Sequence, residues 1–118
     1  MQQLGLFLKL VRWPNLVFII ITQVLFHFCV ILPSANSQYL SFPMRLSMPM
    51  FWMLVLASVC IAGAGYIIND YFDINIDEVN KPDKVIVNKT ISRRSAIFWH
   101  WLLSAIGLLL SGWISYQL

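Results

Sequence analysis

Three long apolar runs without a charged residue limit what this chain can fold into more than any other feature of its sequence. They cover residues 16–32, 48–68 and 96–118. Each is close to the ~20 residues that a helix needs to cross the hydrocarbon core of a bilayer. Because lipid offers no partners to backbone N–H and C=O groups, a helix is the conformation in which such runs satisfy their own hydrogen bonds. The runs therefore predict an all-α membrane protein with three transmembrane helices.

The composition supports the same class. Of the 118 residues, 59% are hydrophobic and 11% are charged. A soluble domain of this size has too little interior to bury so much apolar surface. The net charge of +3 is not typical of nucleic-acid binding here, because the charged residues are confined to short segments outside the apolar runs. We expect the lipid bilayer as the surroundings and no nucleic acid as a partner.

The basic residues predict an orientation in the membrane. Arg45 alone lies between the first and second runs, and the other seven of the eight lie before the first run or between the second and third: Lys9, Arg12, Lys81, Lys84, Lys89, Arg93 and Arg94. Lys and Arg are in excess on the cytoplasmic side of membrane proteins. We therefore expect the N-terminus and the loop 69–95 to be cytoplasmic, in an inner membrane of the bacterial type.

All five acidic residues fall between positions 70 and 83, directly after the second run: Asp70, Asp73, Asp77, Glu78 and Asp83. On a continuous helix, Asp70, Asp73 and Asp77 would lie within about 60° of one another, and Asn69 would extend the same face. Carboxylates packed so closely repel one another unless a cation lies among them. Oxygen ligands favour a hard cation such as Mg2+. The pattern predicts a Mg2+ site after the second helix.

The residues after the acids have the opposite charge. Residues 81–94 contain five basic side chains and one acidic one. Mg2+ usually takes one or two protein carboxylates and completes its shell with water and the oxygens of a phosphorylated substrate. A diphosphate site needs acidic side chains that bind the metal and basic side chains that bind the anion. This segment contains both, in that order.

Three other interpretations were weighed for these charges. They could form an ordinary solvated loop, the usual fate of charge runs. An EF-hand is excluded because Glu78 replaces the required glycine and Lys84 occupies the position of the bidentate glutamate. For Arg93 and Arg94, contact with lipid headgroups is the preferred interpretation.

The residues of this segment resemble the UbiA family of intramembrane prenyltransferases. The family's first aspartate-rich motif has the form N-D-x-x-D-x-x-x-D followed by N-K-P-x-R-P. This chain reads NDYFDINID at positions 69–77 and NKPDK at positions 80–84. RWPN at positions 12–15 is similar to the start of the family's first helix.

The resemblance implies an enzyme that transfers a polyprenyl group from an isoprenyl diphosphate to an aromatic or lipid acceptor within the membrane. It implies catalytic roles for Asp70, Asp73 and Asp77, which together with Asn69 would hold Mg2+. It also implies that Asn15, Lys81 and Lys84 contact the diphosphate. The metal and the basic groups would stabilise the leaving diphosphate, while an apolar cavity shields the allylic cation.

The chain departs from the family pattern in two places and in extent. Lys84 stands where the family has arginine, and VIVNK at positions 85–89 replaces its usual PIPSG, which favours a lipid-modifying branch that prenylates a glycerol phosphate. Family members have about nine transmembrane helices and a second aspartate-rich motif, whereas no acidic residue follows Asp83 here. We expect residues 1–118 to be the N-terminal part of such a bundle, an incomplete fragment that needs the missing C-terminal helices or a partner chain. The alternative is a small non-catalytic membrane assembly or cation-binding protein.

Two features of the runs predict helix packing. Thr22, Gln23 and His27 form a polar stripe on the first run, which needs a protein neighbour because its polar groups would be unpaired in lipid. His27 is expected to be an interhelical histidine. The small residues at positions 62–65, AGAG, allow another backbone to approach closely.

Overall fold

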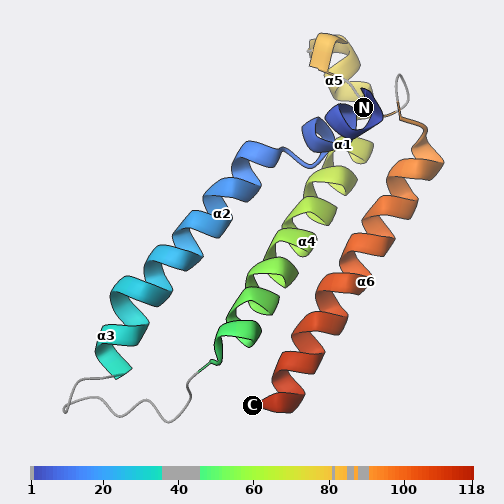
Figure 1. Cartoon of the computed structure of the whole chain (residues 1–118). Helices are drawn as coiled ribbons and strands as arrows, with labels where there is room; N and C mark the ends of the chain where they lie inside the picture. The colour runs from blue at the N-terminus through green and yellow to red at the C-terminus, as the bar shows by residue number, and fades with distance from the viewer. Residues whose placement is uncertain (1, 36–45, 81, 85–86, 88–90) are drawn as a thin grey trace.

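The computed structural model describes residues 2–35, 46–80, 82–84, 87 and 91–118, the side chains of Ala35, Asp77, Glu78 and Lys84 excepted. Within that part of the chain the fold is helical and contains no strand. Three rods dominate it and alternate in direction (Figure 1). Each contains a stretch long and apolar enough to cross a membrane: Trp13–Ser34, Met48–Phe72 and Arg93–Gln117. The prediction of an all-α protein with three transmembrane helices is confirmed.

The first rod is built from three segments that follow one another without a break. Helix α2 (Trp13–Phe26) continues into a π-helical turn, η1 (His27–Ile31), and then into α3 (Leu32–Ala35). The backbone N–H of Leu32 donates to the carbonyl oxygen of His27, five residues earlier, as a π-helix requires. A proline ring clashes with the carbonyl four residues before it in a regular helix, and for Pro33 that carbonyl belongs to Cys29 in η1. The widened turn lies where this clash has to be relieved.

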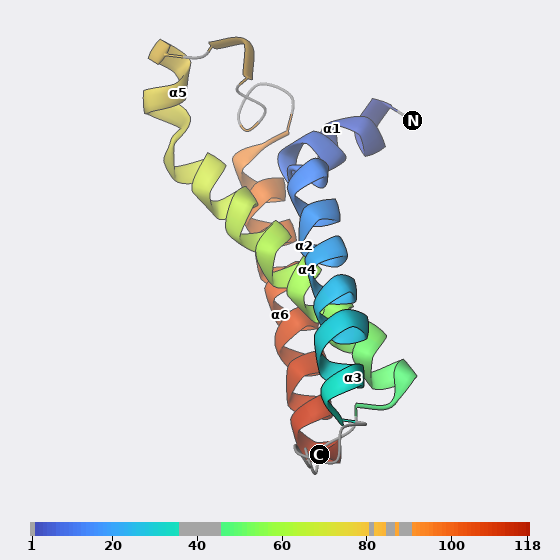
Figure 2. The ribbon, with the colours of Figure 1, turned by 90° about the vertical axis from the view of Figure 1, so that its left-hand side faces the viewer.

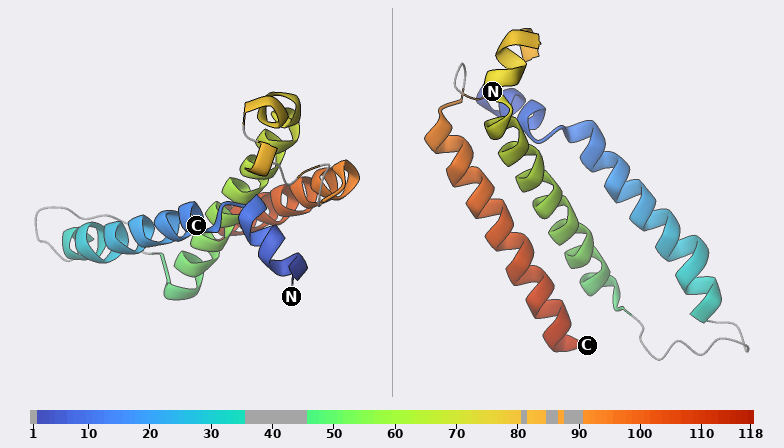
Figure 3. Two further views of the ribbon diagram at one scale, coloured as in Figure 1. Left: turned by 90° about the horizontal axis from the view of Figure 1, so that it is seen from above. Right: turned by 180° about the vertical axis from the view of Figure 1, so that it is seen from behind.

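Helix α4 (Met48–Phe72) lies between the first rod and α6 (Arg93–Gln117), as the view from behind shows (Figure 3). It buries residues along its whole length: Phe51, Val55, Ala57, Cys60, Gly63, Ala64 and Ile67. In contrast, α2 buries none of its residues and α6 buries Ala96, Gly107 and Ile114. At 1.5 Å per residue, the 25 residues of α4 extend about 37 Å, enough to cross a bilayer core.

Helices α4 and α6 approach closely at Gly107. A Cβ atom there would lie 2.5 Å from Cγ1 of Ile61 and 3.2 Å from the carbonyl oxygen of Ala57, so a larger residue does not fit unless the helices shift. Closer to the start of α6, the Nδ1–H of His100 donates to the carbonyl oxygen of Ala64 in α4 at 3.0 Å. The small residues predicted to pack do so at Gly63 and Ala64, which are buried, whereas Gly65 is exposed.

The short helix α1 (Gln2–Leu10) crosses the end of the bundle where α4 ends and α6 begins (Figure 1). We call this the motif end. A small core joins its elements, made of Leu10, Val11, Ile67, Ile74, Val87 and Ala96. The rings of Phe7 and Trp99 pack beside it with their centroids 4.8 Å apart.

The boundaries of the elements correct two expectations from the sequence. The second helix continues to Phe72, so Asn69 and Asp70 lie in its last turn and not in a loop that starts at residue 69. The chain also does not continue as one helix through the acids. Asp73 ends α4 with φ −86° and ψ 4°, and α5 (Ile74–Asn80) leaves in a new direction (Figure 2). The other two spans begin before their apolar runs, because residues 13–15 and 93–95 join the helices.

Candidate functional site

The site predicted from the acids is built on the last turn of α4. Asn69 and Asp70 belong to this turn, and Asp73 follows it at the point where the helix ends. The Nδ2 group of Asn69 donates to Oδ2 of Asp73 at 2.9 Å, which fixes the two side chains on one face. Residues four apart share a helix face, so this contact follows from their spacing.

Arg12 joins this group from a distant part of the sequence. Its Nη2 donates to Oδ1 of Asp70 at 2.9 Å, an ion pair in which 46% of the arginine side chain and 22% of the aspartate side chain remain exposed. Its guanidinium also lies over the ring of Tyr66, 5.2 Å from the centroid. The sequence interpretation counted Arg12 as a topology charge and did not assign it to the site. Its place in the RWPN string beside Asn15 is the signal that could have found it.

Asn15 lies at the same end of the bundle, in the first turn of α2. Its backbone N–H donates to the carbonyl oxygen of Arg12 at 2.9 Å, and its side chain is exposed. The bend between α1 and α2 therefore carries both Arg12 and Asn15 to the motif end. The structure thus places Asn15 at the same end of the bundle as Asn69, Asp70 and Asp73.

Three other predicted site residues are described only in part or not at all. Asp77 belongs to α5, beyond the bend at Asp73, and Lys84 ends η2 (Pro82–Lys84). Lys81 lies outside the described residues. Their proposed roles in binding metal and diphosphate stay predictions.

The donor set suits a hard cation. Asp70, Asp73 and Asn69 offer carboxylate and amide oxygens, the ligands that Mg2+ prefers. Within the described residues, no three His, Cys, Asp or Glu side chains gather closely enough to hold a metal by themselves. Mg2+ takes one or two carboxylates and fills its shell from water and substrate phosphate, so Asp70 and Asp73 are its candidate ligands, each with one oxygen that already accepts a hydrogen bond, from Arg12 and from Asn69.

Arg93 and Arg94 form the first turn of α6 at the motif end, and both are exposed. The start of a helix carries a partial positive charge, so cations there are not favoured by the helix itself. Ser92 caps this helix by accepting a hydrogen bond from the backbone N–H of Ser95 at 3.2 Å. The motif end thus combines acidic side chains on α4 with basic ones on α6 and at Arg12.

Comparison with known proteins adds a family to this geometry. The model of the family described as "UbiA prenyltransferase family" matches residues 28–118. A digeranylgeranylglyceryl phosphate synthase from Methanosarcina barkeri is 34% identical over 110 residues, covering 89% of this chain and 37% of the relative. One from Methanothrix thermoacetophila is 45% identical over 64 residues, covering 53% of this chain and 24% of the relative.

The matched segments are short relative to these proteins. The chain spans little more than a third of the length of the Methanosarcina barkeri relative and about a quarter of the Methanothrix thermoacetophila one. No solved structure matches this chain.

Proposed function

Because this chain belongs to the UbiA prenyltransferase family, we propose that it carries the diphosphate-binding part of a membrane enzyme that transfers an isoprenyl group to a lipid acceptor. The donor is an isoprenyl diphosphate, whose charged end meets the motif end while its apolar tail lies along the helices. Since the chain spans only 37% of its Methanosarcina barkeri relative, further C-terminal helices or a partner chain complete the enzyme.

The observation that carries this proposal is the meeting of opposite charges at the end of a membrane-spanning helix. Asp70 and Asp73 are carboxylates suited to a divalent cation, and Arg12 is a guanidinium in contact with one of them. Arginine binds phosphate oxygens with its planar array of donors. A diphosphate complexed with Mg2+ needs both kinds of group.

The proposed reaction starts when the bond between the allylic carbon and the diphosphate oxygen breaks, and the electron pair leaves with the diphosphate. The hydroxyl oxygen of the acceptor then bonds to the allylic carbon, and its proton passes to the released diphosphate. Bound Mg2+ would supply positive charge that stabilises the leaving diphosphate. The proposed metal-binding residues are Asn69, Asp70, Asp73 and Asp77, and the proposed diphosphate-binding residues are Arg12, Asn15, Lys81 and Lys84.

The second requirement is a dry environment for the allylic cation, to which the apolar helices of this chain contribute one wall and the remaining helices of the enzyme the rest. The first rod and α4 are both long and apolar enough to cross a membrane, and their apolar runs, residues 16–32 and 48–68, contain no charged side chain. Excluding water prevents the cation from being hydrolysed before the acceptor reaches it.

For the acceptor we propose a glycerol phosphate lipid. The relatives are named for digeranylgeranylglyceryl phosphate, a product that carries isoprenyl chains on a glyceryl phosphate. The departures at Lys84 and at positions 85–89 favour the same branch of the family.

A chimera tests the proposal. Residues 1–118 would replace the matching segment of the Methanosarcina barkeri relative, with which they share 34% identity. The expected result is transfer of a labelled geranylgeranyl group from its diphosphate to geranylgeranylglyceryl phosphate, dependent on Mg2+. The unmodified relative serves as the positive control.

The chimera also separates the proposed enzyme from a non-catalytic alternative. A chimera that inserts in the membrane and binds Mg2+ but neither binds the diphosphate nor forms product would contradict the proposal and favour a cation-binding assembly. Product formed equally well in the presence of a metal chelator would contradict the role of Mg2+.

A further inference from the structure

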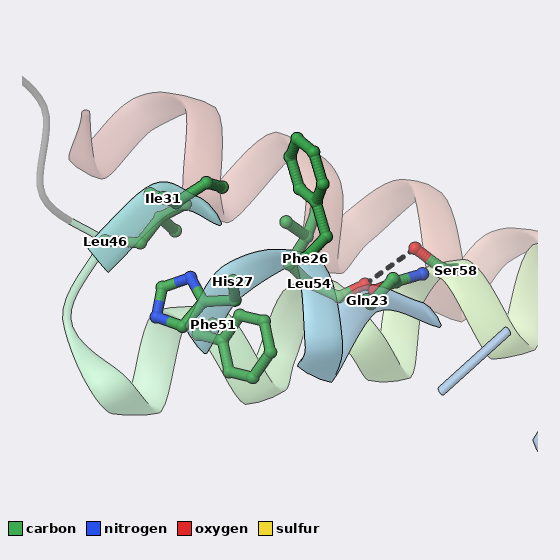
Figure 4. A pocket seen from close by; sticks show the side chains of 8 residues that line it. All are labelled: Gln23, Phe26, His27, Ile31, Leu46, Phe51, Leu54 and Ser58. Carbon is green, nitrogen blue, oxygen red and sulfur yellow. Dashed lines mark hydrogen bonds between the residues drawn. The ribbon is translucent and has the colours of Figure 1, made fainter. Parts of the chain in front are cut away.

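A cavity of about 170 Å³ lies between the first rod and the beginning of α4, at the end of the bundle opposite the motif end (Figure 4). Aromatic and aliphatic side chains line most of it, and Gln23, His27 and Ser58 add polar groups. Phe26, with 57% of its surface exposed, stands at its rim. The cavity therefore opens beside Phe26, on a face that the described helices leave exposed.

His27 is the buried polar residue of this cavity. Only 3% of its surface is exposed, and its ring stacks on that of Phe51 with centroids 4.1 Å apart and planes 21° apart. The sequence predicts a histidine that lies between helices with its hydrogen bonds satisfied; the packing against Phe51 agrees with this, but Nε2 of His27 has no hydrogen-bond partner. The stacking fixes the ring, and His27 also begins the π-helical turn, a feature frequent at functional sites.

Two buried polar atoms of the described residues have no hydrogen-bond partner, and both line this cavity. They are Nε2 of His27 and Oε1 of Gln23. The hydroxyl of Ser58, in contrast, donates to the carbonyl oxygen of Leu54 at 3.0 Å (Figure 4). Buried polar atoms in native proteins are nearly always paired. Gln23 and His27 lie about one turn apart on the first rod, and their side chains extend toward different parts of the cavity, the Gln23 amide beside Ser58 and the His27 ring beside Phe51 (Figure 4).

We propose that this cavity binds a neutral hydroxyl group at the end of an apolar molecule from the bilayer. A hydroxyl can pair with Nε2 of His27 in either tautomer, by donating to the bare nitrogen or by accepting from Nε2–H. A charged ligand is excluded because none of the lining side chains is Asp, Glu, Lys or Arg, and burying an unpaired charge is costly. A dry cavity of about 150 Å³ holds benzene, so about 170 Å³ accommodates one phenol-sized group.

The proposal is tested on the whole 118-residue chain in phospholipid nanodiscs. The chain contains two histidines, which makes selective ¹⁵N labelling simple to interpret. His100 already bonds to Ala64 and serves as the internal reference. The chain would be titrated with p-cresol and with p-xylene, which replaces the hydroxyl by a methyl group of similar size.

The expected result is a saturable shift of the His27 ¹⁵N signals with p-cresol, no such shift with p-xylene, and an unchanged His100. A second titration with geraniol distinguishes an isoprenoid alcohol from a phenol as the source of the hydroxyl. The proposal is overturned if both alcohols leave His27 unmoved, or if p-xylene produces the same shift.

Variants locate the binding. His27→Phe keeps an aromatic ring beside Phe51, and Gln23→Leu keeps the volume of the side chain. His27→Phe should weaken p-cresol binding by about tenfold, the effect of one ordinary hydrogen bond, measured by line broadening of the ligand signals. Gln23→Leu should weaken it less, because the Gln23 amide lies beside Ser58 and away from the His27 ring (Figure 4). Thr22→Val is the matched control, because the hydroxyl of Thr22 bonds to the carbonyl oxygens of Phe18 and Ile19 on its own helix. Equal affinity in all three variants would contradict the assignment, and the comparison of p-cresol with p-xylene on the unmodified chain remains valid if a variant does not fold.

Discussion

Arg12 has a backbone conformation that costs energy. Its φ of 54° and ψ of 59° are left-handed, and it is the one residue other than glycine with a positive φ in the part of the chain that the structure describes. For a residue with a Cβ this conformation costs roughly 1–2 kcal/mol. The partly exposed ion pair with Asp70 returns at most about 1 kcal/mol. The contact of the guanidinium with the Tyr66 ring adds about 0.5–1 kcal/mol, so the two interactions roughly offset the backbone cost and leave little net stabilisation.

Replacing Arg12 by glycine separates these two effects. Arg12→Gly relieves the backbone strain while it removes the ion pair, so we expect the melting temperature of the complete enzyme to change little. Loss of a hydrogen bond to a charged group corresponds to about 1.5–3 kcal/mol, so binding of isoprenyl diphosphate should weaken by roughly 10-fold or more. Thermal unfolding and calorimetric titration measure the two. A large drop in melting temperature with unchanged affinity would make Arg12 a structural residue.

Asp73 and Asp83 provide a second test at this scale. Asp73→Asn keeps the shape of the side chain but removes the charge that Mg2+ requires, so transfer in the complete enzyme should fall by a hundredfold or more. Asp83 is exposed in η2, and Asp83→Asn should leave most of the activity. Initial rates at equal expression give the comparison. Equal residual activities would count against the site.

Among the elements, α4 and α6 form the closest helix pair, and their contact depends on Gly107. Helices in lipid associate through close packing of small residues, because lipid tails are as apolar as the side chains. At Gly107 the neighbouring atoms are a side chain and a backbone carbonyl of α4. The carbonyl cannot move without moving the helix.

Replacing Gly107 or Gly112 of α6 by alanine should therefore have opposite effects on stability. Gly107→Ala should destabilise the fold by about 1–3 kcal/mol, the usual cost of overpacking. A Cβ atom at Gly112 would have no neighbour within 4 Å, so Gly112→Ala should be neutral or stabilising by up to about 1 kcal/mol through helix propensity. Unfolding by a denaturing detergent measures both. If the two variants unfold alike, the close approach at Gly107 is wrong.

For the whole molecule, the alternating direction of the three rods places the start of α4 and the end of α5 at opposite ends of the bundle (Figure 1). Ser47 precedes α4 at one end, while Asn80 ends α5 at the other, and both are exposed. The charge distribution predicts that the motif end is cytoplasmic. After replacement of Cys29 and Cys60, a thiol introduced at Asn80 should react with an impermeant maleimide only from the cytoplasmic face, and one at Ser47 only from the other. Labelling of both thiols from one face would contradict the transmembrane topology.

The three rods also predict what the chain does without further helices. Large apolar side chains of α6, including Trp101, Leu108 and Leu109, are more than 60% exposed. We expect the purified chain to form no prenylated lipid even with Mg2+ and isoprenyl diphosphate, because three helices do not enclose an allylic cation. Supplying the remaining helices of the Methanosarcina barkeri relative as a separate chain should restore product. Turnover by the isolated monomer would contradict this division of the site.

The sequence by itself determined which segments are membrane helices and where the acids lie along the chain. Uncharged runs of that length have no alternative in lipid, and Asp70 and Asp73 follow the second run in the sequence itself. Tertiary structure alone decided that Arg12 meets Asp70, that His27 stacks on Phe51, and that α4 lies between the other rods. In a membrane helix the lipid-facing and protein-facing sides are both apolar, so hydrophobic periodicity does not show which faces meet. The bend at Asp73 could not be predicted from the sequence either. The helical spacing of the acids predicts a common face only while the helix continues, and α4 ends at Asp73.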